Sequence, residues 1–154
     1  MPQVLTCGTS DEAMAVPRVE TRRHWVTMPF FHVWFSTKKR KWLLQGEIAV
    51  VVKRLIESTA LEKGSRLLEC EPMVDHVHLL LKASGKAELP WLMKLLKSRS
   101  AYELFKAEPE LKLDFGTNSL WQTSFNARMV PQSQVATVRR YIRTQDQRLE
   151  KYER

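Results

Sequence analysis

The sequence predicts an α+β fold of the ferredoxin-like or RRM-like type, with an antiparallel sheet built in the order βαββαβ and one added C-terminal helix. Short runs of aromatic and β-branched residues alternate with segments whose apolar residues recur every three or four positions. The 154 residues suit one compact domain. Residues 1–21 are mixed in character without a clear period, so we expect a poorly ordered extension there and one domain over residues 22–154.

The four strands are expected where short apolar runs are bounded by turn-forming residues. These runs cover about residues 24–36, 67–74, 76–82 and 125–130. In the first run, Pro29 is expected to interrupt the strand, because proline has no backbone N–H to donate to a neighbouring strand. Pro131 ends the last run for the same reason.

The three helices are expected where apolar residues recur at helical spacing. They cover about residues 46–63, 89–105 and 133–149. Gly64 lies just past the first helix, where a C-cap is common, and Ser133 is the expected N-cap of the last helix. The candidate core residues of the middle helix are Leu92, Leu95, Leu96, Tyr102 and Leu104. A polar stretch connects the middle helix to the last strand.

Composition and charge limit the classes of function. The chain carries 25 Lys and Arg against 17 Asp and Glu, and the formal net charge of +8 suggests a polyanionic partner, either nucleic acid or an anionic membrane. The longest apolar run, residues 48–52, is far below the ~20 residues of a membrane span, and no secretory signal is present. Cys7 and Cys70 lie outside any CxxC pattern, which predicts free thiols and a cytoplasmic location.

A histidine pair lies on the third predicted strand, in the segment Asp75-His76-Val77-His78-Leu79-Leu80-Leu81. Alternation along a strand places His76 and His78 on one face, with Cα atoms ~6.6 Å apart, so both imidazoles can converge on one metal ion. Asp75 points to the opposite face and would act through the backbone or a loop. Such a pair alone is more often structural, and a third ligand would have to come from elsewhere in the chain.

The last predicted helix carries Tyr141 and Gln145 one turn apart, so their side chains project side by side. A tyrosine hydroxyl can serve as a nucleophile when a nearby metal polarises its target. The amide oxygen of Gln145 could supply the third metal ligand that the histidine pair lacks. A tyrosine on an amphipathic helix is otherwise usually a core or interface residue.

Basic residues gather in three segments that could neutralise DNA phosphates and make binding fall steeply with salt. These segments are the turn after the first strand, the middle helix and the last helix. The candidate DNA-binding residues are Lys38, Lys39, Arg40, Lys94, Lys97, Arg99, Arg140 and Arg143. For any single one of them, a solvated charged surface is about as plausible.

The histidine segment and the late segment Tyr141-Ile142-Arg143-Thr144-Gln145 together resemble the single-tyrosine HUH transposases, which comprise small insertion-sequence transposases and their REP-associated relatives. HUH denotes two histidines around a hydrophobic residue, here Val77. The resemblance covers most of residues 24–150 and includes the segments 31–38 and 94–101. The family often has Met-Pro-Asp before the pair, whereas this chain has Met73-Val74-Asp75.

The resemblance implies a transposase that cleaves and rejoins single-stranded DNA. Tyr141 would attack a phosphodiester to form a 5′-phosphotyrosine link and release a 3′-hydroxyl, while His76, His78 and Gln145 would hold Mg²⁺ or Mn²⁺. It also implies recognition of hairpins at the ends of a mobile element and a homodimer whose tyrosine helix comes from either subunit. A membrane partner is not implied.

Two other functions fit parts of the sequence. A non-catalytic RRM-like module that binds RNA or DNA would share the charge and fold, but such modules usually carry stacking aromatic residues on their central strands. The third predicted strand offers Leu79, Leu80 and Leu81 instead. A domesticated REP-associated relative would keep the cleavage chemistry and serve its host.

Overall fold

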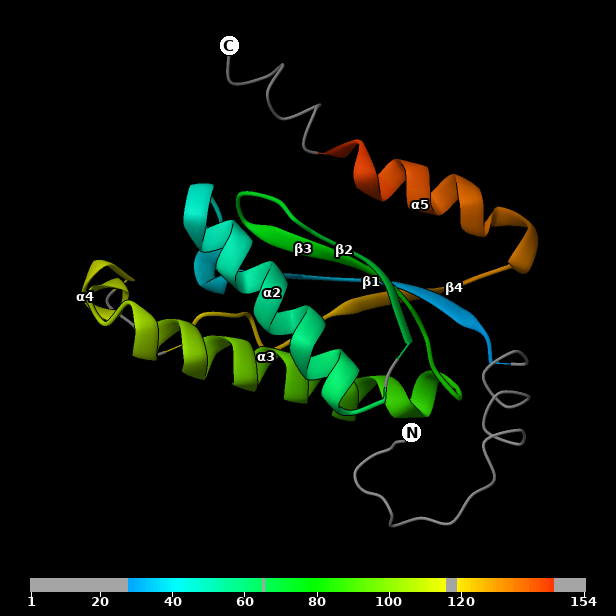
Figure 1. The fold of residues 1–154 in the computed structure, drawn as a ribbon, viewed down its shortest axis with the longest axis horizontal. Coiled ribbons are helices and arrows are strands. Elements are labelled where there is room, and N and C mark those ends of the chain that lie inside the picture. Colours follow the sequence, from blue (N-terminus) through cyan, green and yellow to red (C-terminus); the bar gives the residue numbers. More distant parts are fainter. Residues whose placement is uncertain (1–27, 65, 116–118, 146–154) are drawn as a thin grey trace.

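A four-stranded antiparallel sheet forms the centre of the fold in the computed structural model, which describes residues 28–64, 66–115 and 119–145 (Figure 1). The strands are β1 (Phe30–Ser36), β2 (Arg66–Pro72), β3 (His76–Lys82) and β4 (Asn126–Val130). They lie in the order β2-β3-β1-β4, and each neighbouring pair is antiparallel. This order is the one that a ferredoxin-like βαββαβ chain produces, so the predicted fold class is confirmed.

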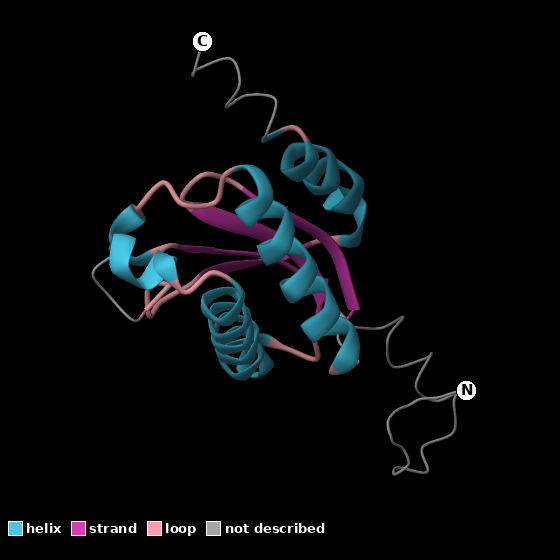
Figure 2. Cartoon of the chain, turned by 60° about the vertical axis from the view of Figure 1, so that its left-hand side comes forward, coloured by secondary structure: helices cyan, strands magenta, loops and turns pink. Residues whose placement is uncertain are grey.

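The helices cover the two faces of the sheet unequally. They are α2 (Gly46–Glu62), α3 (Leu89–Ala107), α4 (Glu110–Phe115) and α5 (Val135–Arg143). The long helices α2 and α3 pack together against one face, whereas α5 is the one helix of the described residues that packs on the other face (Figures 1 and 2). None of the helices within the described ranges is long and apolar enough to cross a membrane.

Strand alternation separates the side chains of the sheet into two sets. On β1, Phe31, Val33 and Phe35 join the large core under α2 and α3, and on β3 the neighbours Val77, Leu79 and Leu81 do the same. The residues between them face α5. A smaller cluster there holds α5 on the sheet and consists of Phe30, Leu80, Val130, Val138 and Ile142.

Several element boundaries differ from the sequence prediction. β1 begins at Phe30, directly after Pro29, and residues 24–27 lie outside the described part. β2 ends at Pro72, because the Met73 N–H donates to the His76 carbonyl oxygen at 2.6 Å and closes a tight turn into β3. The helix α4 was not predicted, since six residues are too few to show a helical period.

Three predictions of detail were wrong. Ser133 is not the N-cap of the last helix: it lies inside a 3₁₀ turn over Gln132–Gln134, and Gln134 precedes α5 without a side-chain cap. Tyr102 is not a core residue, because 64% of it is exposed on α3. The last helix ends earlier than predicted, because α5 stops at Arg143 with Thr144 as its C-cap. The predicted extension over residues 1–21 and the part of the predicted last helix over residues 146–149 lie outside the described residues.

Candidate active site

A pocket of about 470 Å³ opens on the α5 side of the sheet. Residues from β1, β3, β4, α5, the segment just after α5 and the turn after β1 line it. They are His32, Trp34, Arg40, His76, His78, Arg128, Tyr141 and Gln145. The fold therefore brings the predicted histidine pair, tyrosine and glutamine to one place, although about 60 residues of sequence separate the pair from the helix.

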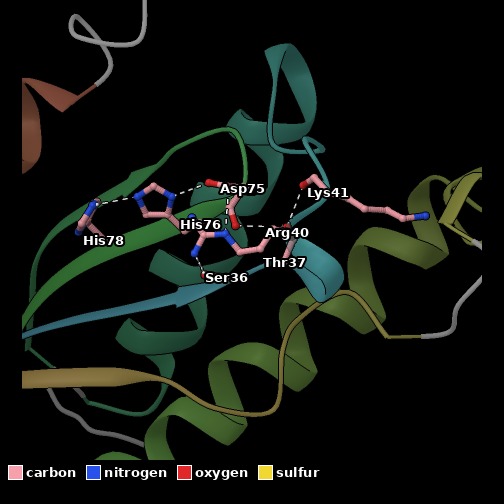
Figure 3. Close-up of polar contacts among 7 residues, drawn as sticks. All are labelled: Ser36, Thr37, Arg40, Lys41, Asp75, His76 and His78. Carbon is pink, nitrogen blue, oxygen red and sulfur yellow. Dashed lines mark hydrogen bonds and ion pairs between the residues drawn. The ribbon is translucent and has the colours of Figure 1, made fainter.

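The two predicted histidines face each other through their Nε2 atoms, which are 3.1 Å apart (Figure 3). β3 places both side chains on the same face, as its alternation predicted. His78 is buried, with 6% of its surface exposed, whereas His76 is half-buried at the pocket edge. The two Nε2 atoms therefore converge at one point that is open to the pocket.

Asp75 and Arg40 support His76 from outside the sheet (Figure 3). The Asp75 Oδ1 atom lies 2.7 Å from His76 Nδ1, and Arg40 Nε donates to Asp75 Oδ2 at 3.0 Å. Arg40 Nη1 also donates to Ser36 Oγ at 3.0 Å. Asp75 therefore acts through its side chain from the loop before β3, one of the two routes expected for it, and its carboxylate fixes the ring orientation of His76.

The turn that carries Arg40 has an unusual backbone. Both Lys39 and Arg40 have positive φ values, 60° and 56°, in the left-handed region that non-glycine residues rarely adopt. The Thr37 hydroxyl shares its one proton between the carbonyl oxygens of Lys41 and Asp75, at 2.8 and 3.2 Å, and the Thr37 backbone N–H donates to the same Asp75 oxygen at 2.8 Å. These contacts hold the turn against the loop before β3. The strained turn is thus fastened to the same loop that supports His76.

His32 is a site residue that was not singled out from the sequence. It lies on β1 with 3% of its surface exposed, and its Nε2 is 3.0 Å from His78 Nδ1. Burial lowers the pKa of His32 to about 4, with a smaller contribution from the charge of Arg128. Burial also lowers the pKa of His78 to about 3, with contributions from His76 and His32. Both rings are therefore neutral at pH 7.

Tyr141 projects from α5 toward the buried histidines. Its ring centroid is 6.0 Å from that of His78 and 6.2 Å from that of His32, and 39% of the residue is exposed. The Gln145 amide donates from Nε2 to the Tyr141 carbonyl oxygen at 3.2 Å, which holds it along the helix beside the pocket. The apolar side chains of Val138 and Ile142, on the opposite edge of α5, are buried against the sheet.

Ion pairs add a second attachment for α5. Glu69 on β2 accepts hydrogen bonds from Arg139 Nε at 2.8 Å and from Arg143 Nη2 at 2.7 Å. Burial opposes ionisation of Glu69, but the hydrogen bonds and charges of the two arginines outweigh burial and lower its pKa. Arg143, a predicted DNA-binding residue, is therefore engaged with Glu69 on the edge of the sheet and does not line the pocket.

The donor atoms of the pocket fit a divalent metal. Adjacent ligands around an octahedral ion with bonds of about 2.0–2.1 Å are separated by roughly 3 Å, which matches the spacing of the two Nε2 atoms. No cluster of three or more His, Cys, Asp or Glu side chains in the described part of the chain is arranged to hold a metal. A third protein ligand would therefore be of another type, and the Gln145 amide oxygen is available at the same pocket.

The predicted DNA-binding residues are distributed over both sides of the sheet. Arg40 lines the pocket, Lys38 and Lys39 lie in the adjacent turn, and Arg140 is exposed on α5. Three others lie on α3, across the sheet: Lys94, Lys97 and Arg99.

Two of the three α3 residues make contacts within the protein. The Lys97 ammonium donates to the carbonyl oxygens of Gln122 and Ser124, at 2.8 and 2.7 Å, and burial lowers its pKa. Arg99 pairs with Glu62 at 3.4 Å. The structure therefore does not bring this group to the pocket.

Arg128 is a second pocket residue that was not singled out from the sequence. It is exposed on β4 and stands directly opposite His32 in the β1–β4 register. Residues opposite each other in an antiparallel pair share a face, so this register turns Arg128 toward the histidines. The alternation of the last strand alone could not reveal it, because the register depends on pairing with β1.

Comparison with known proteins identifies the family of the chain. The family described as "Transposase IS200 like" matches residues 26–145, a range that contains every pocket residue. The ISDra2 transposase TnpA of Deinococcus radiodurans is 34% identical over 115 residues, which cover 75% of this chain and 82% of the relative. The transposase for insertion sequence element IS200 of Salmonella typhimurium is 27% identical over 115 residues, which cover 75% of each chain.

Solved structures give the same result. A crystal structure of a Deinococcus radiodurans protein described as a transposase superposes with a TM-score of 0.63 at 33% identity, over 79% of this chain and 93% of that one. A REP-associated tyrosine transposase bound to a REP hairpin superposes with a TM-score of 0.51 over 77% of this chain and 64% of that one, and its 11% identity makes it a likeness of fold alone. The chain therefore belongs to the IS200-like transposase family, whose members are DNA strand transferases.

Proposed function

We propose that this transposase is metal-dependent and cleaves and rejoins single-stranded DNA through a 5′-phosphotyrosine intermediate at Tyr141. The observation that carries the proposal is the single pocket in which the Tyr141 ring lies 6.0 Å from the His78 ring, next to two converging histidine nitrogens. Each of these features has an ordinary structural explanation when taken alone. Because separate strands and the last helix bring these residues to one pocket, a catalytic role for the pocket is favoured.

In the cleavage step, the Tyr141 hydroxyl oxygen would attack a backbone phosphorus and lose its proton. The bond from phosphorus to the 3′-oxygen would break, and that oxygen would leave as a 3′-hydroxyl after gaining a proton. The 5′-phosphate would remain bonded to the tyrosine, so the energy of the broken bond is conserved. Attack by a 3′-hydroxyl on this link would rejoin a strand and restore Tyr141.

The metal site would consist of His76 Nε2, His78 Nε2 and the amide oxygen of Gln145, with Mg²⁺ or Mn²⁺ as the ion. When bound, the ion supplies Lewis-acid polarisation of the scissile phosphate, which a phenol needs because it is a weak nucleophile at neutral pH. Gln145 already stands at the pocket, and its Nε2 is the atom that bonds the helix. Its oxygen is thus the atom left for a ligand role.

The substrate would be a single strand next to a hairpin at an element end. The net charge of +8 and the arginines of the pocket wall, Arg40 and Arg128, support a phosphate backbone as the ligand. The structural neighbour bound to a REP hairpin supports the hairpin preference. We also propose a homodimer, which sedimentation of the full chain with and without DNA tests.

A non-catalytic RRM-like module is disfavoured, because the central strands present histidines and only one aromatic residue, Trp34, to the pocket. A domesticated relative would retain the same cleavage chemistry. Hairpin-forming repeats on both sides of the gene distinguish a mobile element from such a relative.

The test uses labelled single-stranded DNA from both flanks of the gene, incubated with the full chain and Mg²⁺ or Mn²⁺. We expect a covalent protein–DNA adduct on a denaturing gel, none with Tyr141→Phe, and none when the metal is chelated. Tyr102→Phe is the matched control, since Tyr102 is exposed on the opposite side of the sheet and this variant should form the adduct normally. An adduct of equal yield from Tyr141→Phe would remove Tyr141 as the nucleophile.

A further inference from the structure

We propose that Trp34 and Asn126 form a nucleobase subsite beside the candidate active site, in which one base of the single-stranded DNA stacks on the Trp34 indole while its edge meets the Asn126 amide. The inference rests on the proposed function, because it assumes that single-stranded DNA occupies the pocket. These two residues would select the nucleotide next to the scissile phosphate.

Trp34 is a half-buried aromatic residue in the wall of the pocket. Its ring packs against that of His32, with centroids 4.9 Å apart and planes inclined by 46°, and its centroid lies 6.4 Å from that of His78. Because Trp34 is only half-buried, part of the indole remains open to the pocket. An aromatic surface left open beside a site for a phosphodiester is a platform on which a base can stack.

The indole stands next to the proposed nucleophile. The centroids of the Trp34 and Tyr141 rings lie 6.4 and 6.0 Å from that of His78, and 4.9 and 6.2 Å from that of His32. Both rings therefore border the same pair of imidazoles. A phosphate presented to the Tyr141 hydroxyl would carry a nucleotide on each side, so the base of one of these nucleotides can reach Trp34.

Asn126 lies directly opposite Trp34 in the β1–β4 register, so the two side chains share the pocket face of the sheet. β4 is an outer strand (Figure 1), and Asn126 is exposed on it. Its amide carries both hydrogen-bond donors and an acceptor, which are the two functions that the polar edge of a base requires. Stacking alone accepts every base, because each has a π face, so discrimination among bases would come from the amide.

Two arginines supply positive charge on either side of the indole. Arg128 follows Asn126 by two residues on the same face of β4 and lines the pocket. Arg40 lines the pocket from the turn after β1, where it also pairs with Asp75. A base on Trp34 would therefore have a cation for the backbone phosphate in each direction, which favours a nucleotide within a strand over a free base as the ligand.

The experiment measures DNA binding by the full chain with Tyr141→Phe as the parent and a chelator present, so that neither cleavage nor a metal enters the result. The probes are labelled single strands from both flanks of the gene, either intact or with one nucleotide at a time replaced by an abasic residue. Fluorescence anisotropy gives the ratio of the dissociation constants of each abasic strand and its intact strand. Because this ratio is taken within one protein variant, a lower folded fraction cancels.

One abasic position, next to the phosphate at which the wild type forms its adduct, is expected to weaken binding by the parent about 5- to 100-fold. Trp34→Leu should lose this dependence, and Trp34→Phe should keep part of it. Asn126→Ala should keep it but no longer distinguish among the four bases placed there. Trp91→Leu removes an exposed indole from α3, on the other side of the sheet, and is the control that should behave like the parent.

The outcomes separate this subsite from the proposed function. If Trp34→Leu weakens binding of intact and abasic strands equally, Trp34 only supports the pocket, and the subsite is overturned even if Tyr141 forms the adduct. An unchanged base preference in Asn126→Ala would overturn the role of the amide. If the Trp34-dependent ratio is found but no adduct ever forms, the subsite stands and the strand-cleavage chemistry fails. If no single strand binds, single-stranded DNA is not the ligand and the subsite fails with it.

Discussion

The two faces of the sheet are built from the same strands and serve different purposes. The face under α2 and α3 buries an unbroken apolar core, to which β1 contributes Phe31, Val33 and Phe35. The side chains of the opposite face alternate with these, yet histidines lie at its centre, and the short α5 is the only helix that covers it within the described part of the chain. One layer of strands can therefore supply stability on one side and a site for chemistry on the other.

The helix α5 depends on few contacts, in contrast to α2 and α3. Five buried apolar residues and the ion pairs of Glu69 hold it on the sheet. The proposed nucleophile, Tyr141, lies on this helix, and the proposed third metal ligand, Gln145, follows directly after its C-cap. Substitutions on the α5 side should therefore reduce activity at the pocket more than they reduce the stability of the fold, whereas substitutions under α2 and α3 should mainly reduce stability.

The largest loss of stability is expected from Phe31→Ala, on the face under α2 and α3. Phe31 is fully buried, and removing such a ring leaves a cavity that typically costs about 3–5 kcal/mol. Urea denaturation measures the free energy of unfolding. A loss below about 1 kcal/mol would mean that this face does not hold the fold.

A smaller loss, about 2–4 kcal/mol, is expected from Ile142→Ala under α5. Because Ile142 helps to anchor the helix that bears Tyr141, adduct formation should fall by more than the fraction of folded protein does. The two quantities are compared at one temperature, by adduct yield and by circular dichroism. Equal fractional losses would show that α5 and the sheet unfold as one unit.

Lowering the pH should decrease the free energy of unfolding through His32, which lies on the pocket side of the sheet. The pKa of His32 in the folded protein, about 4, lies below its ordinary value of 6.5, so its contribution is complete above pH 6.5 and is lost as the pH falls toward 4. Between pH 7 and pH 5 this loss amounts to roughly 2 kcal/mol. Denaturation series at several pH values measure it, and His32→Gln should show a shallower dependence. Identical pH profiles of the wild type and His32→Gln would show that His32 does not cause the loss of stability in acid.

The smallest effect is expected from Glu69→Gln, at about 1 kcal/mol or less, because the pair with Arg143 is partly exposed. The pKa of Glu69 is lowered from 4.5, so its contribution is present above that value and is lost as the pH falls through the lower folded value. Wild type and variant should therefore converge in stability in strong acid. Glu62→Gln is the control, since it removes one carboxylate from a longer and more exposed pair with Arg99 on the other side of the sheet and should change stability less than Glu69→Gln does.

The sequence was sufficient for features that depend on local periodicity. The alternation around Val77 predicted β3 over residues 76–82 and placed both histidines on one face, which the structure confirms. Features that depend on pairing between distant segments could not be predicted. His32 and Arg128 reach the pocket through the register of β1 with β3 and β4, and Tyr102 was misplaced because helical spacing does not say which side of a helix meets the core.

The strained turn after β1 has a consequence for how such an enzyme can diversify. If Lys38 and Lys39 contact DNA as predicted, they could be exchanged without loss of the support of His76, because Arg40 is the residue of this turn that pairs with Asp75. A replacement for Lys39 would still have to adopt its positive φ of 60°. Arg40 faces the same pocket but also holds Asp75, and through it His76. Replacing Arg40 would change both the predicted contact with DNA and the orientation of His76. A lineage that acquires a new target sequence should therefore vary the two lysines while it retains the arginine.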